Sequence, residues 1–292
     1  MIEVVAPGPY ATVQDLGRPG FAHLGVPCSG AADAPALKLA NRLVGNAEWP
    51  AGIELTFGGA RLRFADAAWV AVTGAPLEVR AAGASGVRPG MGAPFWVPAG
   101  AELIFGMPGT GLRTYVAVRG GIAVEPVLGS RSTDSLSGLG PPPLRAGDTL
   151  PVGGADGLIT VDQAPLPGPR PAVLRVVPGP RDDWFAGGAL EVLCGRPYEV
   201  SQDSNRVGVR LHGPELARAR EGELPSEGMV TGAVQVPPSG QPIVFLADHP
   251  PTGGYPVIAV VLDADLPVAA QLRPGDRVRF TLAQGLARPA GP

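Results

Sequence analysis

The chain has 292 residues, of which 45% are hydrophobic and 17% are charged, and its formal net charge is −3. This balance is typical of a globular protein, and the absence of a basic run argues against nucleic acid as a partner. No stretch has the roughly 18 consecutive apolar residues of a membrane helix, and residues 1–25 do not resemble a signal peptide, so we expect a cytoplasmic protein without membrane contact.

The lysine and cysteine content excludes several kinds of site. Lys38 is the only lysine, and its surroundings fit neither a phosphate-binding GxxxxGK[ST] loop, nor a Schiff-base lysine, nor a biotin attachment site. The two cysteines, Cys28 and Cys194, and three histidines predict no disulfide framework and no metal site. We expect both cysteines to be buried, apolar thiols.

Short strands separated by Gly and Pro predict a mostly β protein. In chain order, the first strong element is a helix near residues 33–45, with Asp33 as its cap, Pro35 in its first turn and Gly45 at its end. Its apolar side consists of Leu37, Leu39, Ala40, Leu43 and Val44. Alternation of apolar and polar residues then predicts strands at 101–105, 114–118, 174–177 and 276–280.

An internal repeat divides the chain into related halves. Three pairs of segments match in the same order: 5–9 with 177–180, 110–118 with 252–260, and 144–148 with 272–276. The repeat predicts a first half at residues 1–152, which contains the helix as an insertion, a linker at 153–172 and a second half at 173–284.

Polar side chains concentrate in a few loops. The segment 129–135 is rich in hydroxyl groups, and the motif at 12–20 contains Asp15 and Arg18. Two apolar runs at 233–236 and 243–247 predict a hairpin, because Pro237-Pro238-Ser239-Gly240 joins them. The second run ends in an irregular loop at 248–256 that contains acid, imidazole, hydroxyl and phenol groups, a pattern typical of functional loops.

Four long motifs resemble the family of the 5-oxoprolinase C subunit, whose members are also called allophanate hydrolase subunit 2, biotin-dependent carboxyltransferase or KipI antagonist. The motifs are TVQDLGRPGFAHLGVPCSGAADAPALKLANRLVGN, RTYVAVRGGIAVEPVLGSRSTD, SQDSNRVGVRLHGPEL and SEGMVTGAVQVPPSGQPIVFLADHPPTGGYP. The resemblance covers about residues 2–282. It implies two cyclophilin-like β-barrel domains, in agreement with the repeat.

The resemblance also implies a function within a complex. The C subunit acts with a KipI-like B subunit and a LamB/YcsF-like A subunit to open 5-oxo-L-proline to L-glutamate with ATP hydrolysis. We therefore expect an ATP-hydrolysing cyclic-amide hydrolase whose C subunit is inactive alone. Two alternatives stay open: the carboxyltransferase component of a biotin-dependent, urea- or allophanate-type enzyme, and a KipI-binding regulatory module without turnover.

The chemistry of a five-membered lactam with a carboxylate suggests which side chains form the site. A guanidinium would hold the carboxylate, and a base and hydrogen-bond donors would act at the ring amide. The substrate-binding candidates are Asp15, Arg18, Ser29, Arg119, Asn205, Arg206 and Arg210, and the catalytic candidates are Asp248, Glu227, Tyr255 and Thr252. For His249, a role in catalysis and a purely structural role of the imidazole stay equally open. We predict a cleft between the halves, lined by Asp15, Arg18 and Ser29 from the first half and by Asn205, Arg206, Asp248, Thr252 and Tyr255 from the second. We also predict that Asp248→Asn abolishes turnover with little change in melting temperature.

Overall fold

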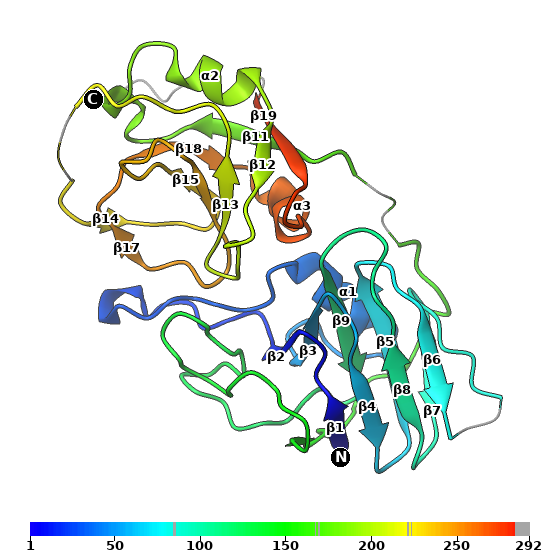
Figure 1. The fold of residues 1–292 in the computed structure, drawn as a ribbon. Helices are drawn as coiled ribbons and strands as arrows, with labels where there is room; N and C mark the ends of the chain where they lie inside the picture. Colours follow the sequence, from blue (N-terminus) through cyan, green and yellow to red (C-terminus); the bar gives the residue numbers. More distant parts are fainter. Residues whose placement is uncertain (84–85, 167, 169, 221, 223, 284–292) are drawn as a thin grey trace. The chain divides into compact units, whose positions relative to one another are not determined.

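The computed structural model describes residues 1–83, 86–166, 168, 170–220, 222 and 224–283, and its contacts divide the chain into two compact units (Figure 1). Unit 1 contains residues 1–19 and 29–169, and unit 2 contains residues 20–28 together with the chain from residue 170 onward. Residue 284, the predicted end of the second half, lies outside the described residues. Each unit buries a hydrophobic core of its own, so each is described by itself.

Unit 1 contains two antiparallel sheets of five strands each. One sheet has the order β10-β1-β4-β8-β6, and the other has the order β2-β3-β9-β5-β7. The strands are β1 (Ile2–Ala6), β2 (Tyr10–Gln14), β3 (Gly52–Thr56), β4 (Arg61–Phe64), β5 (Ala68–Gly74), β6 (Val79–Ala82), β7 (Pro94–Val97), β8 (Glu102–Phe105), β9 (Arg113–Val118) and β10 (Thr149–Leu150). Unit 1 also contains α1 (Ala34–Leu43).

The core of unit 1 combines apolar side chains from both sheets, including Val4, Leu62, Val72 and Val116. Strand β9 differs from the predicted alternation, because all six of its residues are buried. One face of the strand joins this core, and α1 packs against the other face and against β5. A strand covered on both faces has no solvent-facing positions, so even its polar residues Arg113 and Thr114 are buried.

Helix α1 forms where the sequence predicts it. The Asp33 carboxylate accepts a hydrogen bond from the Ala36 backbone N–H at 3.1 Å, and Pro35 lies in the first turn. Val44 is the C-cap of the helix, and Gly45 follows with φ of 73°. Asn41 is buried among the apolar residues, a position that periodicity does not predict, and its amide donates to the Pro50 carbonyl at 2.8 Å.

Unit 2 is a closed β-barrel with the order β11-β18-β15-β16-β13-β12-β19 (Figure 1). Its barrel strands are β11 (Val173–Pro178), β12 (Tyr198–Val200), β13 (Gly208–His212), β15 (Ala233–Gln235), β16 (Ile243–Phe245), β18 (Val257–Val261) and β19 (Arg277–Leu282). The short strands β14 (Glu227–Gly228) and β17 (Thr252–Gly253) pair separately. Two helices, α2 (Ala189–Gly195) and α3 (Leu266–Ala270), accompany the barrel, and single 3-10 turns occur at Ala22–Leu24, Asp182–Trp184 and Asp263–Asp265.

Closure of this barrel depends on the parallel pairing of β11 with β19, whereas the other neighbours are antiparallel. The predicted hairpin is confirmed, since β15 and β16 pair directly. The mostly β architecture and the inserted helix are also confirmed. The predicted barrel is closed in unit 2, whereas the strands of unit 1 are grouped into two sheets that enclose one core.

The third pair of repeated segments forms the same turn in both units. The Asp148 carboxylate accepts from the Arg145 N–H at 2.7 Å, and the Asp276 carboxylate accepts from the Arg273 N–H at 2.8 Å. Each turn exchanges the same two backbone hydrogen bonds with a strand residue, but that residue is Val4 of β1 in unit 1 and Val200 of β12 in unit 2. The repeat therefore preserves local turn chemistry more closely than strand order.

Segments outside the strands complete the fold. Residues 153–166 lie along unit 1, where the Gly153 N–H donates to Gly121 at 3.0 Å and the Ala164 N–H donates to Gly92 at 2.8 Å. The prediction of two buried thiols is wrong, because Cys28 is exposed and Cys194 is half-buried. Cys28 lies in a segment without helix or strand, where apolar composition alone does not determine burial. None of the helices among the described residues has the length and apolarity to span a bilayer.

Candidate functional site

Asp15 joins two distant segments of unit 1. It follows β2, and its Oδ1 accepts hydrogen bonds from the Ser130 and Ser132 hydroxyls at 2.6 and 2.5 Å. Its Oδ2 accepts from the Arg131 backbone N–H at 2.6 Å, and the Gly17 N–H donates to Oδ1 at 2.8 Å. A carboxylate with four donors fixes the hydroxyl-rich loop against the end of β2.

Arg18 reinforces the same connection from the interior, since its side chain is fully buried. Its guanidinium donates to the carbonyls of Ser132 and Val127, and Nη1 lies 3.9 Å from the Asp134 carboxylate. Gly140 packs directly beside these groups with φ of 79°, and an added Cβ would lie 2.0 Å from the Ser132 oxygen. No side chain fits at that position, which leaves room for the guanidinium.

Ser29 has an uncommon backbone conformation for a residue with a side chain, with φ of 55°. Its hydroxyl donates to the Thr133 carbonyl at 3.0 Å. The next residue, Gly30, also has a positive φ, and an added Cβ would lie 2.8 Å from the Gly17 nitrogen. Asp15, Arg18 and Ser29 therefore converge on one loop, in which the sequence motifs indicated no site residue.

Three buried polar atoms in this region lack a hydrogen-bond partner among the described residues: Gln14 Oε1, Arg18 Nη1 and Thr133 Oγ1. They lie on segments that are already joined, because the Gln14 amide donates to the Thr133 carbonyl at 3.0 Å. Unpaired buried polar atoms are uncommon in folded proteins, and ordered water or a polar ligand usually satisfies them. We define the loop cluster as Gln14, Asp15, Arg18, Ser29 and residues 130–134.

Arg206 and Asp248 form a buried ion pair in unit 2. The guanidinium Nε and Nη2 donate to the two carboxylate oxygens at 2.9 and 3.0 Å, and the side chains are 3% and 0% exposed. The Asp248 N–H also donates to the Arg206 carbonyl at 3.1 Å. The paired geometry is the bidentate arrangement that orients both groups, so this pair fixes the start of the 248–256 loop against the segment before β13.

His249 continues this loop as a neutral imidazole. Its ring stacks on Phe245 with centroids 5.8 Å apart, and Nδ1 lies 2.8 Å from the Pro250 carbonyl oxygen. Because a carbonyl only accepts, Nδ1 holds the proton and Nε2 carries the lone pair. Burial lowers the pKa of His249 below its usual value, although the Pro250 carbonyl and the Asp248 charge favour the protonated form.

The other catalytic candidates lie on the short β14–β17 pair and the loop that follows it. Glu227 forms an ion pair with Arg181, and this hydrogen bonding lowers the pKa of the Glu227 carboxyl, so it stays ionised at neutral pH. Thr252 is exposed on β17 and pairs with Gly228. Tyr255 is half-buried, with the Arg218 guanidinium 5.7 Å from its ring centroid.

The remaining substrate-binding candidates lie at more accessible positions. Asn205 is exposed and forms a turn in which its side-chain oxygen accepts from the Val207 N–H at 2.8 Å. Arg210 is exposed on β13. Arg119 follows β9 in unit 1 and donates to the Gly157 carbonyl. The candidates thus form separate groups within the two units, and the cleft between the halves stays a prediction.

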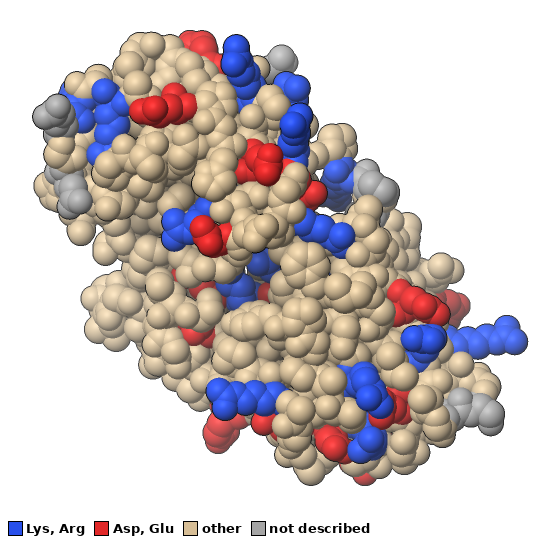
Figure 2. Space-filling view, viewed as in Figure 1, with Lys and Arg blue, Asp and Glu red and all other residues tan. Residues whose placement is uncertain are grey.

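Neither the surface charge nor the potential metal ligands point to a further site among the described residues. Basic and acidic side chains are interspersed over the visible surface of each unit (Figure 2). Among the residues that the structure describes, no three His, Cys, Asp or Glu side chains gather as metal ligands.

Comparison with known proteins shows extensive similarity. Residues 24–282 match the family model described as carboxyltransferase domain, subdomain A and B. The chain is 39% identical to the C subunit of 5-oxoprolinase from Escherichia coli and 35% identical to that from Haemophilus influenzae, in each case over 96% of this chain and 90% of the relative.

Solved structures give the same result. The crystal structure of the K. lactis urea amidolyase matches 96% of this chain with a TM-score of 0.88 and 32% identity. The match covers 18% of that much longer chain. The chain therefore belongs to the carboxyltransferase domain, subdomain A and B, family, in agreement with the family predicted from its motifs.

Proposed function

We propose that this chain is the C subunit of an ATP-dependent 5-oxoprolinase and contributes to the opening of 5-oxo-L-proline to L-glutamate. The similarity to the corresponding Escherichia coli protein carries this proposal, because it extends over 90% of that protein. The coverage matters, since a chain similar to one domain of a larger enzyme would support only a shared fold.

Burial divides the candidate residues into two roles. Asp15, Arg18, Arg206 and Asp248 are nine-tenths or more buried and are held by internal hydrogen bonds, so we assign them to positioning of loops. The exposed or half-buried residues are the ones that can contact a small substrate. They are Arg119, Asn205, Arg210, Glu227, Thr252 and Tyr255.

Substrate contact by these groups follows from their chemistry. Within unit 2, Arg210 provides a guanidinium for the 5-oxoproline carboxylate, and Asn205, Thr252 and Tyr255 provide neutral hydrogen-bonding groups for the ring amide. Glu227 is a poor proton donor, because its pKa is lowered by Arg181. Nucleophilic attack on the ring carbonyl develops negative charge on its oxygen before the C–N bond breaks, and neutral donors stabilise that charge without a competing counterion.

ATP does not fit the N-terminus of α1, the longest helix among the described residues. The N-terminus of α1 is occupied by the Asp33 carboxylate, and the buried Glu54 carboxylate accepts the Ala32 N–H at 3.1 Å. Two carboxylates at this position repel a phosphate, whereas a phosphate site requires free backbone N–H groups. The N-terminus of α1 therefore does not supply a phosphate site, and we propose that ATP acts at the level of the complex with the KipI-like and LamB/YcsF-like subunits.

The proposal is tested by 5-oxoproline-dependent ATP hydrolysis, measured with this chain alone and with the KipI-like and LamB/YcsF-like subunits added. We expect hydrolysis only from the three-component mixture. Full turnover by the single chain would contradict the requirement for the two partner subunits. No stimulation of the two partners by this chain would contradict its assignment to 5-oxoprolinase.

Carboxyl transfer is the second candidate function, because of the family description and the similarity to the urea amidolyase structure. In that case a partner must carry the biotin, since the chain has no biotin attachment motif around Lys38. Avidin blotting of the assembled complex distinguishes the two candidates. A biotinylated protein that co-purifies and is required for turnover would favour carboxyl transfer.

A further inference from the structure

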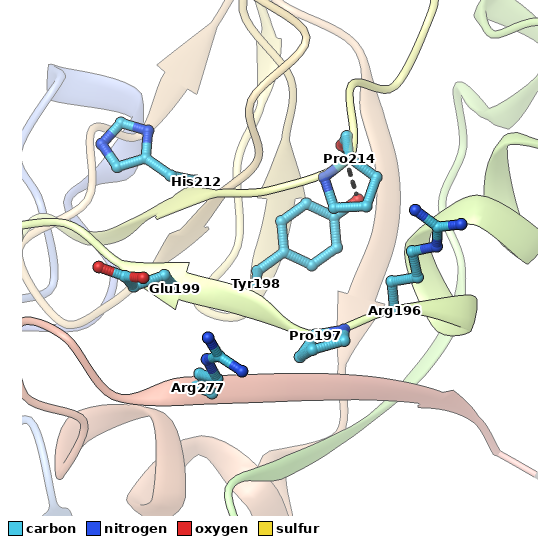
Figure 3. Close-up of a pocket in the computed structure, with 7 residues that line it drawn as sticks. All are labelled: Arg196, Pro197, Tyr198, Glu199, His212, Pro214 and Arg277. Atoms are coloured by element: carbon cyan, nitrogen blue, oxygen red, sulfur yellow. Dashed lines mark hydrogen bonds between the residues drawn. The ribbon is translucent and has the colours of Figure 1, made fainter.

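A surface cavity of about 440 Å³ lies on the barrel of unit 2, and its lining includes none of the candidate residues described above (Figure 3). It is formed where β12 lies between β13 and β19, together with the residues just before β12 and after β13. Its volume is within the range of small-molecule sites. Its polar lining consists of Arg196, Glu199, His212 and Arg277.

Strand pairing places three of these side chains on one face. Glu199 of β12 is the direct partner of His212 on β13 and of Arg277 on β19. Directly opposite residues project from the same face of a sheet, and all three are exposed on the outside of the barrel. The pairing thus fixes the order cation, carboxylate and imidazole across the cavity, and Arg196 lies at its other end (Figure 3).

The base of the cavity is rigid. The Tyr198 ring is fully buried, packs edge-to-face on Phe280 with centroids 5.9 Å apart, and donates its hydroxyl to the Pro214 carbonyl at 3.0 Å. Burial raises the pKa of Tyr198 to about 12, so this donor is retained at neutral pH. Gly213 lies so close to the ring that a Cβ would be 2.6 Å from it. A fixed base holds the backbone positions from which the charged side chains project.

The four polar side chains of the cavity have no hydrogen bond or ion pair with any described residue. Other arginines of unit 2 are paired: Arg175 with Asp265 at 2.8 Å, and Arg206 with Asp248. Two unpaired guanidinium groups and one unpaired carboxylate in a preformed cavity are complementary to a ligand with two negative groups and one positive group.

We propose that this cavity binds a small dicarboxylate that carries an ammonium group, the class that includes the acidic amino acids. Arg196 and Arg277 hold the two carboxylates, and Glu199 holds the ammonium group. L-glutamate, the product of the proposed reaction, belongs to this class. The idea that L-glutamate acts here as a sensed product rests on the proposed function. The binding of such a dicarboxylate to the cavity does not depend on the proposed function.

Isothermal titration calorimetry of the intact chain tests this proposal without its partners or ATP, so its result does not depend on turnover. The probes are L-glutamate, glutarate, which lacks the ammonium group, and L-glutamine, which lacks the second carboxylate. We expect binding of L-glutamate that exceeds binding of either analogue.

Variants assign the binding to the cavity. Arg196→Ala and Arg277→Ala should each weaken L-glutamate binding about tenfold or more, because each removes a charge-assisted hydrogen bond. Glu199→Gln should weaken L-glutamate binding and leave or improve glutarate binding. Arg279→Ala is the matched control, because Arg279 is exposed on the same strand but does not line the cavity. Absence of L-glutamate binding at millimolar concentration, or equal binding by the Arg277 and Arg279 variants, would overturn the proposal.

Discussion

Replacement of Asp248 by Asn tests the structural role of the Arg206 ion pair. The carboxylate is fully buried and accepts two hydrogen bonds from a guanidinium that is itself 3% exposed. Loss of the negative charge breaks this buried ion pair, and breaking a buried ion pair by removing one partner typically destabilises a protein by about 3–5 kcal/mol. This result differs from the small stability effect expected from the sequence, because the sequence does not show that the side chain is buried.

Urea unfolding followed by circular dichroism measures this loss, and hydrogen exchange of unit 2 peptides localises it. Asp203→Asn is the control, since Asp203 is exposed on the segment that contains Arg206. The free energy of unfolding of this variant should stay within about 0.5 kcal/mol of that of the wild type. The double variant Arg206→Met with Asp248→Leu should recover part of the loss, because it removes both charges. A change below about 1 kcal/mol for Asp248→Asn would refute the argument.

Three further predictions concern stability. Asp15→Ala should lower the free energy of unfolding by about 3 kcal/mol or more, since it removes four hydrogen bonds to a buried carboxylate, whereas the exposed Asp156→Ala should have little effect in the same urea titration. Tyr115→Phe should cost about 1–3 kcal/mol, because the buried hydroxyl donates to the Glu54 carboxylate at 2.7 Å, and equal wild-type and variant midpoints would contradict this. Burial lowers the pKa of His249 in the folded state, so its contribution to stability is complete above the unfolded pKa of about 6.5 and is lost as pH falls from that value through the folded pKa. His249→Gln should therefore make the free energy of unfolding less dependent on pH in this window, and an unchanged pH dependence would contradict this expectation.

Local patterns predicted the elements that local chemistry determines. The helix α1 was predicted from a capping Asp33, a proline in the first turn and Gly45 after the last turn, and these signals act within a few residues. The hairpin of β15 and β16 was predicted for the same reason. Burial on both faces of β9 was not predicted, because it depends on contact with a helix far away in the sequence.

The candidate sites were predicted less completely, because their partners are distant in sequence. Asp15 and Ser132 are separated by 117 positions, and alternation or turn chemistry does not indicate such a contact. The pairing of Arg206 with Asp248 likewise requires the register of β13 and β16. The cavity around Glu199 gave no sequence signal, because its polar residues are single exposed positions on and beside three strands.

The most direct test of the proposed function is the release of L-glutamate from 5-oxo-L-proline. The KipI-like and LamB/YcsF-like subunits are incubated with ATP and 5-oxo-L-proline, with and without this chain, and L-glutamate is measured by chromatography. We expect L-glutamate formation that requires this chain and is matched by consumption of ATP. Formation at the same rate without the chain, or no formation in the complete mixture while urea supports turnover, would contradict the assignment to 5-oxoprolinase.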